Sequence, residues 1–257
     1  MLDVALVNDT SLWNSHFGCQ LVGQVYREQL ARVGLNLKLS LPISFDHAKY
    51  SSELSRVSLV VINGEGSIHH GKNMHLVELA NHFPCVLMNC VYEENPEVPA
   101  LRKMLFCSSR ESLSSERIRG QGVSCVVVPD MLFASSLLWS FPAKDAVYEI
   151  GSTDSVLDKG KWRKRTLADK FMRRKSGPVR SGFGVDGNPG IVVDKILSYK
   201  RLCAGRFHAA VACAILQRPF STWDSNTWKT RGMMKTVTLI VMEVLRNEFA
   251  FFLDLCF

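Results

Sequence analysis

Short, almost continuously apolar runs recur along the first 130 residues, and each is followed by a stretch with helical spacing. Strands that are apolar on both faces belong to parallel sheets covered by helices on both sides. The alternation therefore predicts a doubly wound α/β domain over residues 1–140. Its clearest strands are expected at 2–8 (LDVALVN), 58–63 (SLVVIN), 85–91 (CVLMNCV) and 125–130 (CVVVPD).

The other elements of this part follow from helical spacing and stop signals. Apolar residues three or four apart, followed by Gly34, predict a helix over 19–33. Further helices are expected near 74–82, 98–105 and 112–119, and further strands at 35–41 and 105–110. Ligands of such sheets bind at the carboxyl ends of the strands. The polar residues expected there are Asn8, Asn63, Asn89, Arg110 and Asp130.

The remaining part of the chain, residues 141–257, predicts a smaller C-terminal Rossmann-like domain. Strands are expected at 146–152, 201–205 and 219–224, and helices at 191–200, 206–216 and 232–249. The basic insertion 159–175 and the Gly-rich loop 180–190 interrupt them. The prediction is thus two Rossmann-like α/β halves with parallel sheets, the second one reduced.

The composition is that of an ordinary globular protein, with 257 residues of which 47% are hydrophobic. No apolar stretch reaches the roughly 18 residues that span a bilayer, and the first residues lack a basic signal-peptide region. The eight cysteines lie mostly in apolar runs without a C-x-x-C pair, and no D-x-D pair occurs. These features predict a cytoplasmic protein with reduced thiols, no metal site and no cofactor.

The net charge of +7 is concentrated in residues 159–175 (KGKWRKRTLADKFMRRK), which carry nine Lys or Arg against one Asp. The rest of the chain is therefore close to neutral. This segment fits either a solvated helix face or a site for a polyanion such as nucleic acid, an acidic polysaccharide or an anionic membrane surface. The candidate acceptor-binding residues are Lys161, Arg163, Lys164, Arg165, Arg173 and Arg174.

Two motifs place ionisable residues where a strand passes into a helix. NGEGSIHHG (63–71) sets Glu65 between Gly64 and Gly66, and glycines there let backbone amides approach an anion. GRFHA (205–209) opens an otherwise apolar helix with Arg206 and His208. Arg is suited to binding carboxylate or phosphate, and His to moving a proton.

Three further segments supply candidate residues. His16 precedes the first helix, and Arg110 stands at a strand end, where a surface ion pair with Glu111 or Glu116 is the alternative. Ser225, Asn226 and Lys229 follow the last predicted strand, where amide and ammonium donors could hold a ligand. A purely structural role stays open for each motif, such as a tight turn, a polar loop or a core histidine with its hydrogen bonds satisfied.

Taken in order, these motifs resemble the polysaccharide pyruvyl transferase family over about residues 3–235, except 143–190. The matching segments are the His-x-Gly loop, the Gly-rich turn, SSRES, VVVPD, GRFHA with RPF, and the closing Ser-Asn-x-x-Lys. The resemblance implies a GT-B-like fold and transfer of a pyruvyl group from phosphoenolpyruvate to a sugar hydroxyl of a glycan. It further implies that Arg206 and Arg110 hold the donor and that His208 is the general acid.

Glu65 departs from that family, which usually has a third glycine at this position. A carboxylate repels a trianionic donor unless it acts as a base, so an activated sugar is the alternative donor. Glu65 or His16 would then deprotonate the acceptor hydroxyl, and Arg206 would stabilise the departing phosphate. With the basic segment, this describes a GT-B glycosyltransferase acting on a polyanion, for example on modified bases in phage DNA. A non-catalytic nucleic-acid-binding module is a further alternative, and it would need only the basic segment.

Overall fold

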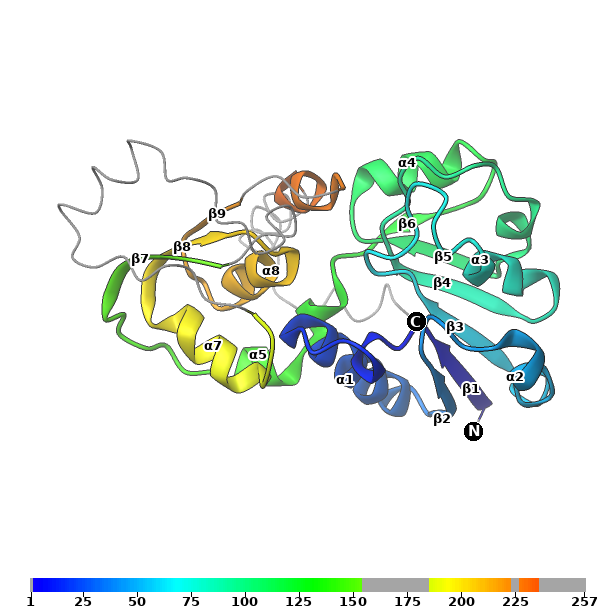
Figure 1. Cartoon of the computed structure of the whole chain (residues 1–257), viewed down its shortest axis with the longest axis horizontal. Helices are drawn as coiled ribbons and strands as arrows, with labels where there is room; N and C mark the ends of the chain where they lie inside the picture. Colours follow the sequence, from blue (N-terminus) through cyan, green and yellow to red (C-terminus); the bar gives the residue numbers. More distant parts are fainter. Residues whose placement is uncertain (1, 154–184, 223–226, 236–257) are drawn as a thin grey trace.

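Two parallel sheets organise the chain into two α/β halves, as the computed structural model shows for residues 2–153, 185–222 and 227–235 (Figure 1). The first half contains a six-stranded sheet and the second a three-stranded sheet. Every strand pair in both sheets is parallel. The predicted fold class, with a reduced second half, is confirmed. In the described residues no helix has the length and apolarity needed to cross a membrane.

The strands of the first sheet lie in the order β2-β1-β3-β4-β5-β6. In this order the direction of winding reverses between β1 and β3, and ligands of such sheets bind at that point, outside the carboxyl ends of the strands. The strands are β1 (Leu2–Val7), β2 (Leu35–Leu41), β3 (Leu59–Asn63), β4 (Cys85–Cys90), β5 (Phe106–Ser109) and β6 (Val126–Val127).

Helices cover both faces of this sheet. The longest is α1 (Phe17–Arg32), whose apolar side is buried and whose first turn is capped by His16. The others are α2 (His47–Leu54), α3 (His75–Glu78) and α4 (Ser112–Arg119). Short 3-10 turns are η1 (Thr10–Leu12), η2 (Leu79–Asn81), η3 (Pro99–Lys103) and η4 (Met131–Ala134).

The second half follows α5 (Ser136–Ser140) and has the strand order β7-β8-β9. Helix α8 is almost entirely buried, and its small residues let it pack closely against its neighbours. The elements are β7 (Tyr148–Ser152), α7 (Pro189–Leu197), β8 (Tyr199–Ala204), α8 (Phe207–Ile215) and β9 (Phe220–Thr222). Residues 229–235 are also helical.

One of the two apolar cores runs across both halves. It joins residues of β1 and α1, such as Leu6 and Leu21, to residues of α7 and α8, such as Ile196 and Val211. The other core lies on the opposite face of the first sheet. Burying a large aliphatic side chain contributes roughly 1.5–3 kcal/mol, so the shared core holds the halves together. The division at residue 140 into two domains therefore stays a prediction.

Several predicted elements are corrected. The helix expected near 98–105 is the 3-10 helix η3, because the Leu105 amide already donates to the Cys85 carbonyl of β4. The helix expected near 74–82 is divided into α3 and η2. The strand expected at 125–130 has only two residues, Val126 and Val127, at the sheet edge. Tyr199 and Lys200, predicted as a helix end, belong to β8 because they pair with β7. The basic segment 159–175 and residues 236–249 of the last predicted helix lie outside the described residues.

Candidate active site

Buried polar side chains line the carboxyl ends of β1, β3, β4 and β5, as expected of a parallel sheet. The five residues predicted there all lie at this edge, and none is more than 5% exposed: Asn8, Asn63, Asn89, Arg110 and Asp130. Apolar residues would be the stable choice at such buried positions, because a buried polar group costs free energy unless it is paired. The edge therefore has the character of a binding site.

Asparagine side chains connect these strand ends. Asn8 donates to the Asn63 carbonyl at 2.6 Å, and Asn63 donates to the Glu65 carboxylate at 3.3 Å. Asn8, Glu65 and Asn89 have φ angles of 59°, 32° and 55°. Non-glycine residues seldom adopt this left-handed backbone, and they concentrate at functional sites.

Glycines bring the turn after β3 close to its surroundings. An added Cβ on Gly64 would lie 2.6 Å from Cβ of Cys90, so only glycine fits there. On Gly66 it would lie 3.3 Å from Nη2 of Arg110 and 3.5 Å from Nζ of Lys229. Gly66 thus faces two cations, and a side chain at this position would fill the space between them and the turn.

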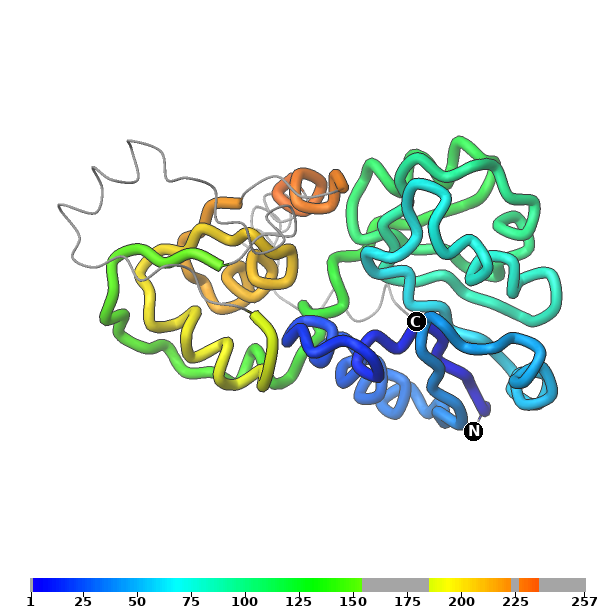
Figure 2. The backbone as a smooth tube through the Cα atoms, viewed as in Figure 1, coloured from blue at the N-terminus to red at the C-terminus, as the bar shows by residue number. Residues whose placement is uncertain are grey.

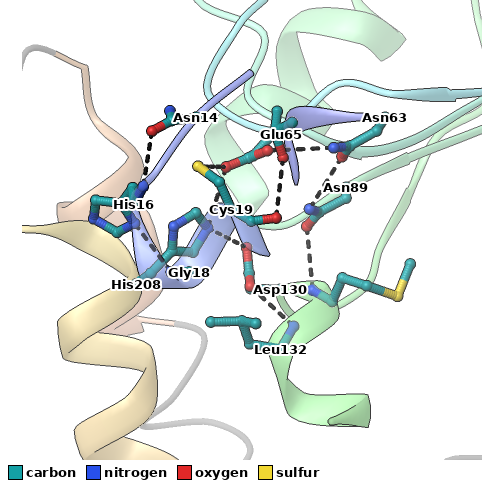
Figure 3. Close-up of polar contacts among 12 residues, drawn as sticks. Asn14, His16, Gly18, Cys19, Asn63, Glu65, Asn89, Asp130, Leu132 and His208 are labelled. Atoms are coloured by element: carbon teal, nitrogen blue, oxygen red, sulfur yellow. Dashed lines mark hydrogen bonds and ion pairs between the residues drawn. The ribbon is translucent and has the colours of Figure 1, made fainter. Parts of the chain in front are cut away.

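Glu65 meets the second half of the chain at His208 (Figure 3). Nε2 of His208 lies 3.5 Å from Oε1 of Glu65 and 3.9 Å from Oδ2 of Asp130. Cys19 donates its thiol to the same Glu65 oxygen at 3.3 Å. Burial lowers the pKa of His208 well below its usual value, although the Glu65 charge opposes this. His208 is therefore a neutral imidazole.

Arg110 forms a buried ion pair instead of the surface pair considered from the sequence. Its Nη1 lies 2.7 Å from Oδ2 of Asp130, and both side chains are 1% exposed. Glu111 instead caps α4 by accepting from the backbone amides of Leu113 and Ser114. The guanidinium also stacks on the ring of Phe207, 4.1 Å from its centroid. Residues from both halves thus hold Arg110 in place.

His16 lies beside His208, with ring centroids 5.4 Å apart. Its Nδ1 accepts from the Gly18 amide at 3.1 Å, so His16 is the cap of α1. An added Cβ on Gly18 would lie 2.3 Å from Cβ of His208, which makes glycine necessary there. The prediction that His16 is a catalytic base is thus left without support from this geometry, since one ring nitrogen is used for capping.

Lys229 is the second cation that faces Gly66, beside Arg110. It belongs to the segment 227–235, which lies between the halves (Figure 2, orange). Its pKa is lowered to about 8, mainly by burial and next by the charge of Arg110, with a further contribution from Arg206. Trp228 attaches this segment to the first half, because its indole donates to Glu111 at 3.2 Å and its amide to Glu93 at 2.9 Å.

The cluster has unsatisfied polar atoms as well. Within the described part of the chain, Asn8 Oδ1, Arg110 Nε and His208 Nε2 are buried and make no hydrogen bond. Buried polar groups are nearly always paired, and exceptions need an explanation such as a missing ligand. These three atoms point to ligand binding at this edge.

Eight of the predicted site residues therefore lie in one region. They are Glu65, His208, His16, Arg110, Lys229, Gly64, Gly66 and Arg206. Arg206 is included because its charge lowers the pKa of Lys229. Ser225, Asn226 and the six basic acceptor candidates lie outside the described residues. The sequence did not indicate a role for Cys19, the contacts of Trp228 with the first half, or the pairing of Arg110 with Asp130. For Cys19, the available signal was its i, i+3 spacing from His16.

A separate hollow of about 220 Å³ lies near the end of α4 and is lined by none of the predicted site residues. Its lining includes Glu94, Glu97 and Glu116 against one arginine, Arg117. These carboxylates would repel an anionic ligand, so this hollow is not suited to phosphate or carboxylate binding.

No family model and no curated protein sequence matches the chain. Solved structures share its fold. An uncharacterized protein from Klebsiella pneumoniae is 13% identical, with a TM-score of 0.61 over 91% of this chain and 87% of that one. An alpha-glucosyltransferase, in complex with UDP and a 13-mer DNA containing a HMU base, is 7% identical, with a TM-score of 0.53 over 96% and 91%. The GT-B-like fold is thereby confirmed.

Proposed function

We propose that this protein is a glycosyltransferase that moves a sugar from a nucleotide-activated donor to a hydroxyl group of a polyanionic acceptor. The observation that carries the proposal is the meeting of a carboxylate, Glu65, with the cations Arg110 and Lys229 around Gly66. The cations suit the phosphates of the donor, and the carboxylate suits the acceptor hydroxyl. The likeness of the fold to an alpha-glucosyltransferase adds support.

The proposed reaction uses each group once. The acceptor oxygen attacks the anomeric carbon, and the bond from that carbon to the phosphate oxygen breaks. Glu65 takes the proton of the hydroxyl, and the electron pair leaves with the phosphate. Arg110 and Lys229 stabilise the charge that develops there, which is commonly the largest contribution to catalysis. His208 lies beside this carboxylate, with Nε2 3.5 Å from Oε1 of Glu65.

Duplex DNA is the acceptor that we propose to test first. The +8 segment 159–175 suits a polyanion, and the alpha-glucosyltransferase of similar fold was solved with DNA. A base inside the duplex would have to flip out of the stack to present its hydroxyl to Glu65. Binding should weaken steeply between low and moderate salt. Salt-independent binding would remove DNA as the acceptor.

Pyruvyl transfer from phosphoenolpyruvate is the second candidate. It is favoured by the neighbourhood of Arg110 and His208, the residues to which the family resemblance assigns donor binding and proton donation. Glu65 counts against it, because a carboxylate beside a trianionic donor costs electrostatic energy.

The donor experiment measures the melting temperature with UDP-sugars and with phosphoenolpyruvate, each over a concentration series. A ligand at 100 times its Kd stabilises the folded state by about 2.7 kcal/mol. We expect a UDP-sugar to raise the melting temperature and DNA with hydroxymethylated bases to gain the mass of one sugar. A shift with phosphoenolpyruvate alone would favour pyruvyl transfer. Arg206, whose charge acts on Lys229, should also help to hold the donor phosphates, so Arg206→Ala should abolish turnover while polyanion affinity persists. A non-catalytic binding module would show no turnover with any donor and would keep its polyanion affinity in this variant.

The stabilisation by a UDP-sugar should depend on pH through Lys229. Its pKa of about 8 means that the ammonium is present below this pH and is lost above it. Donor-induced stabilisation should therefore be full near pH 7 and fall as the pH rises through about 8. The diphosphate of a UDP-sugar does not titrate in this range. Lys229→Met should show a smaller stabilisation without this pH dependence.

The reference for each measurement is the ligand-free protein at the same pH. This matters because the lowered pKa of Lys229 makes the folded state bind fewer protons than the unfolded state between about 8 and 10.5. The ligand-free protein thus gains stability from this residue as the pH rises, opposite in sign to the donor effect. An unchanged donor effect in Lys229→Met would remove Lys229 from the donor site.

A further inference from the structure

Three potential metal ligands meet where the first turns of α1 and α8 approach each other. One ligand atom each of His16, Cys19 and His208 lies within 4.8 Å of the other two, and all three residues are buried. Their i, i+3 spacing puts His16 and Cys19 on one side of α1, and Gly18 lets His208 approach from the second half. Local spacing of cysteines and carboxylates had indicated no metal site.

We propose that His16, Cys19 and His208 bind a zinc ion. Imidazole and thiolate together are ligands that zinc prefers, and three protein ligands with one open position are typical of catalytic zinc sites. The proposal goes beyond the transfer reaction and does not rest on it.

The three ligand atoms lie within 4.8 Å of one another and would move closer around a zinc ion, and Glu65 lies against two of them. Oε1 of Glu65 lies 3.3 Å from Sγ of Cys19 and 3.5 Å from Nε2 of His208. Ligand atoms on a tetrahedral zinc ion are separated by about 3.3–3.8 Å, given its bonds to nitrogen and sulfur. Oε1 of Glu65 thus lies where a further oxygen ligand of the ion could stand.

His208 supplies the second, independent observation. Its Nε2 is buried in this cluster and makes no hydrogen bond within the described residues. A buried ring nitrogen without a partner is costly, and coordination of a cation would satisfy it.

Zinc binding requires Cys19 and His16 each to give up a hydrogen bond. Cys19 loses its thiol proton to solvent and with it the hydrogen bond to Glu65. His16 gives up its cap on the Gly18 amide, since a neutral imidazole that coordinates through one nitrogen carries its proton on the other. The free energy of one helix cap is small beside that of zinc binding to cysteine and histidine. The ion would join α1 of the first half to α8 of the second.

The test uses the full chain without an affinity tag, reduced and stripped of metal by a chelator, then titrated with Co²⁺. We expect one Co²⁺ per chain, with a thiolate-to-cobalt absorption band that zinc removes. Cys19→Ser should lose this band, with affinity reduced by more than about 100-fold, because even outer-shell changes at metal sites cost 10–100-fold. The matched control Cys203→Ser, on β8 and not among the clustered ligands, should keep it.

A wild-type protein without a thiolate band, or a Cys19→Ser protein that keeps one, would overturn the proposal. X-ray absorption of the zinc-loaded wild type needs no variant. It should show one sulfur and two imidazole nitrogens, and several sulfurs would instead mean adventitious binding by other cysteines. Because no substrate is present, failure here would leave the proposed transfer reaction untouched.

Discussion

Arg110→Met is expected to lower the free energy of unfolding by about 3–5 kcal/mol, because it leaves the carboxylate of Asp130 buried without its partner. Both side chains of this ion pair are 1% exposed, and the distance between them is 2.7 Å. Stacking on Phe207 is lost as well. Urea denaturation, followed by circular dichroism, measures the change.

The double variant Arg110→Met with Asp130→Asn should recover most of this loss. Asparagine removes the unpaired charge but keeps the oxygen that accepts from the Leu132 amide. The surface pair Lys144 and Asp194, with side chains 50% and 59% exposed, provides the matched control. Lys144→Met should change stability by less than about 1 kcal/mol. Equal losses in the single and double variants would show that the Asp130 charge is not the cause.

Glu65→Gln is expected to reduce turnover by about 10²–10⁴-fold, the usual contribution of a general base. Glutamine has nearly the same shape, so the fold should persist. The affinity for a UDP-sugar should stay the same or increase, since the change removes a negative charge beside the donor phosphates. Steady-state kinetics on the modified acceptor and donor-induced stabilisation measure the two effects separately.

Glu53→Gln, on the exposed side of α2, is the matched control and should leave both quantities unchanged. A Glu65→Gln protein with wild-type turnover would exclude Glu65 as the base. A variant that loses donor affinity along with turnover would instead indicate that the change disturbed the asparagine network around Glu65.

Periodicity along the chain was sufficient for the architecture. Continuous apolar runs such as β1 and β3 could be buried only between two helical layers, so a parallel sheet followed. Because parallel strands end at a common edge, the convergence of Asn8, Asn63 and Asn89 was also predictable. Short elements were not predictable, since the bounds of η3 and β6 depend on pairing with neighbouring strands more than on any repeat of their own.

The sequence by itself determined the α/β class, the edge of the sheet that carries the site and most of its ionisable residues, because these depend on local burial patterns. Only the tertiary structure decided the long-range partners: Asp130 for Arg110, and Glu65 for both Cys19 and His208. These contacts join residues from different strands and from both halves. They depend on how the strands and helices of the first half pack together and, for His208, on how the two halves meet through a shared apolar core. No local spacing encodes this packing.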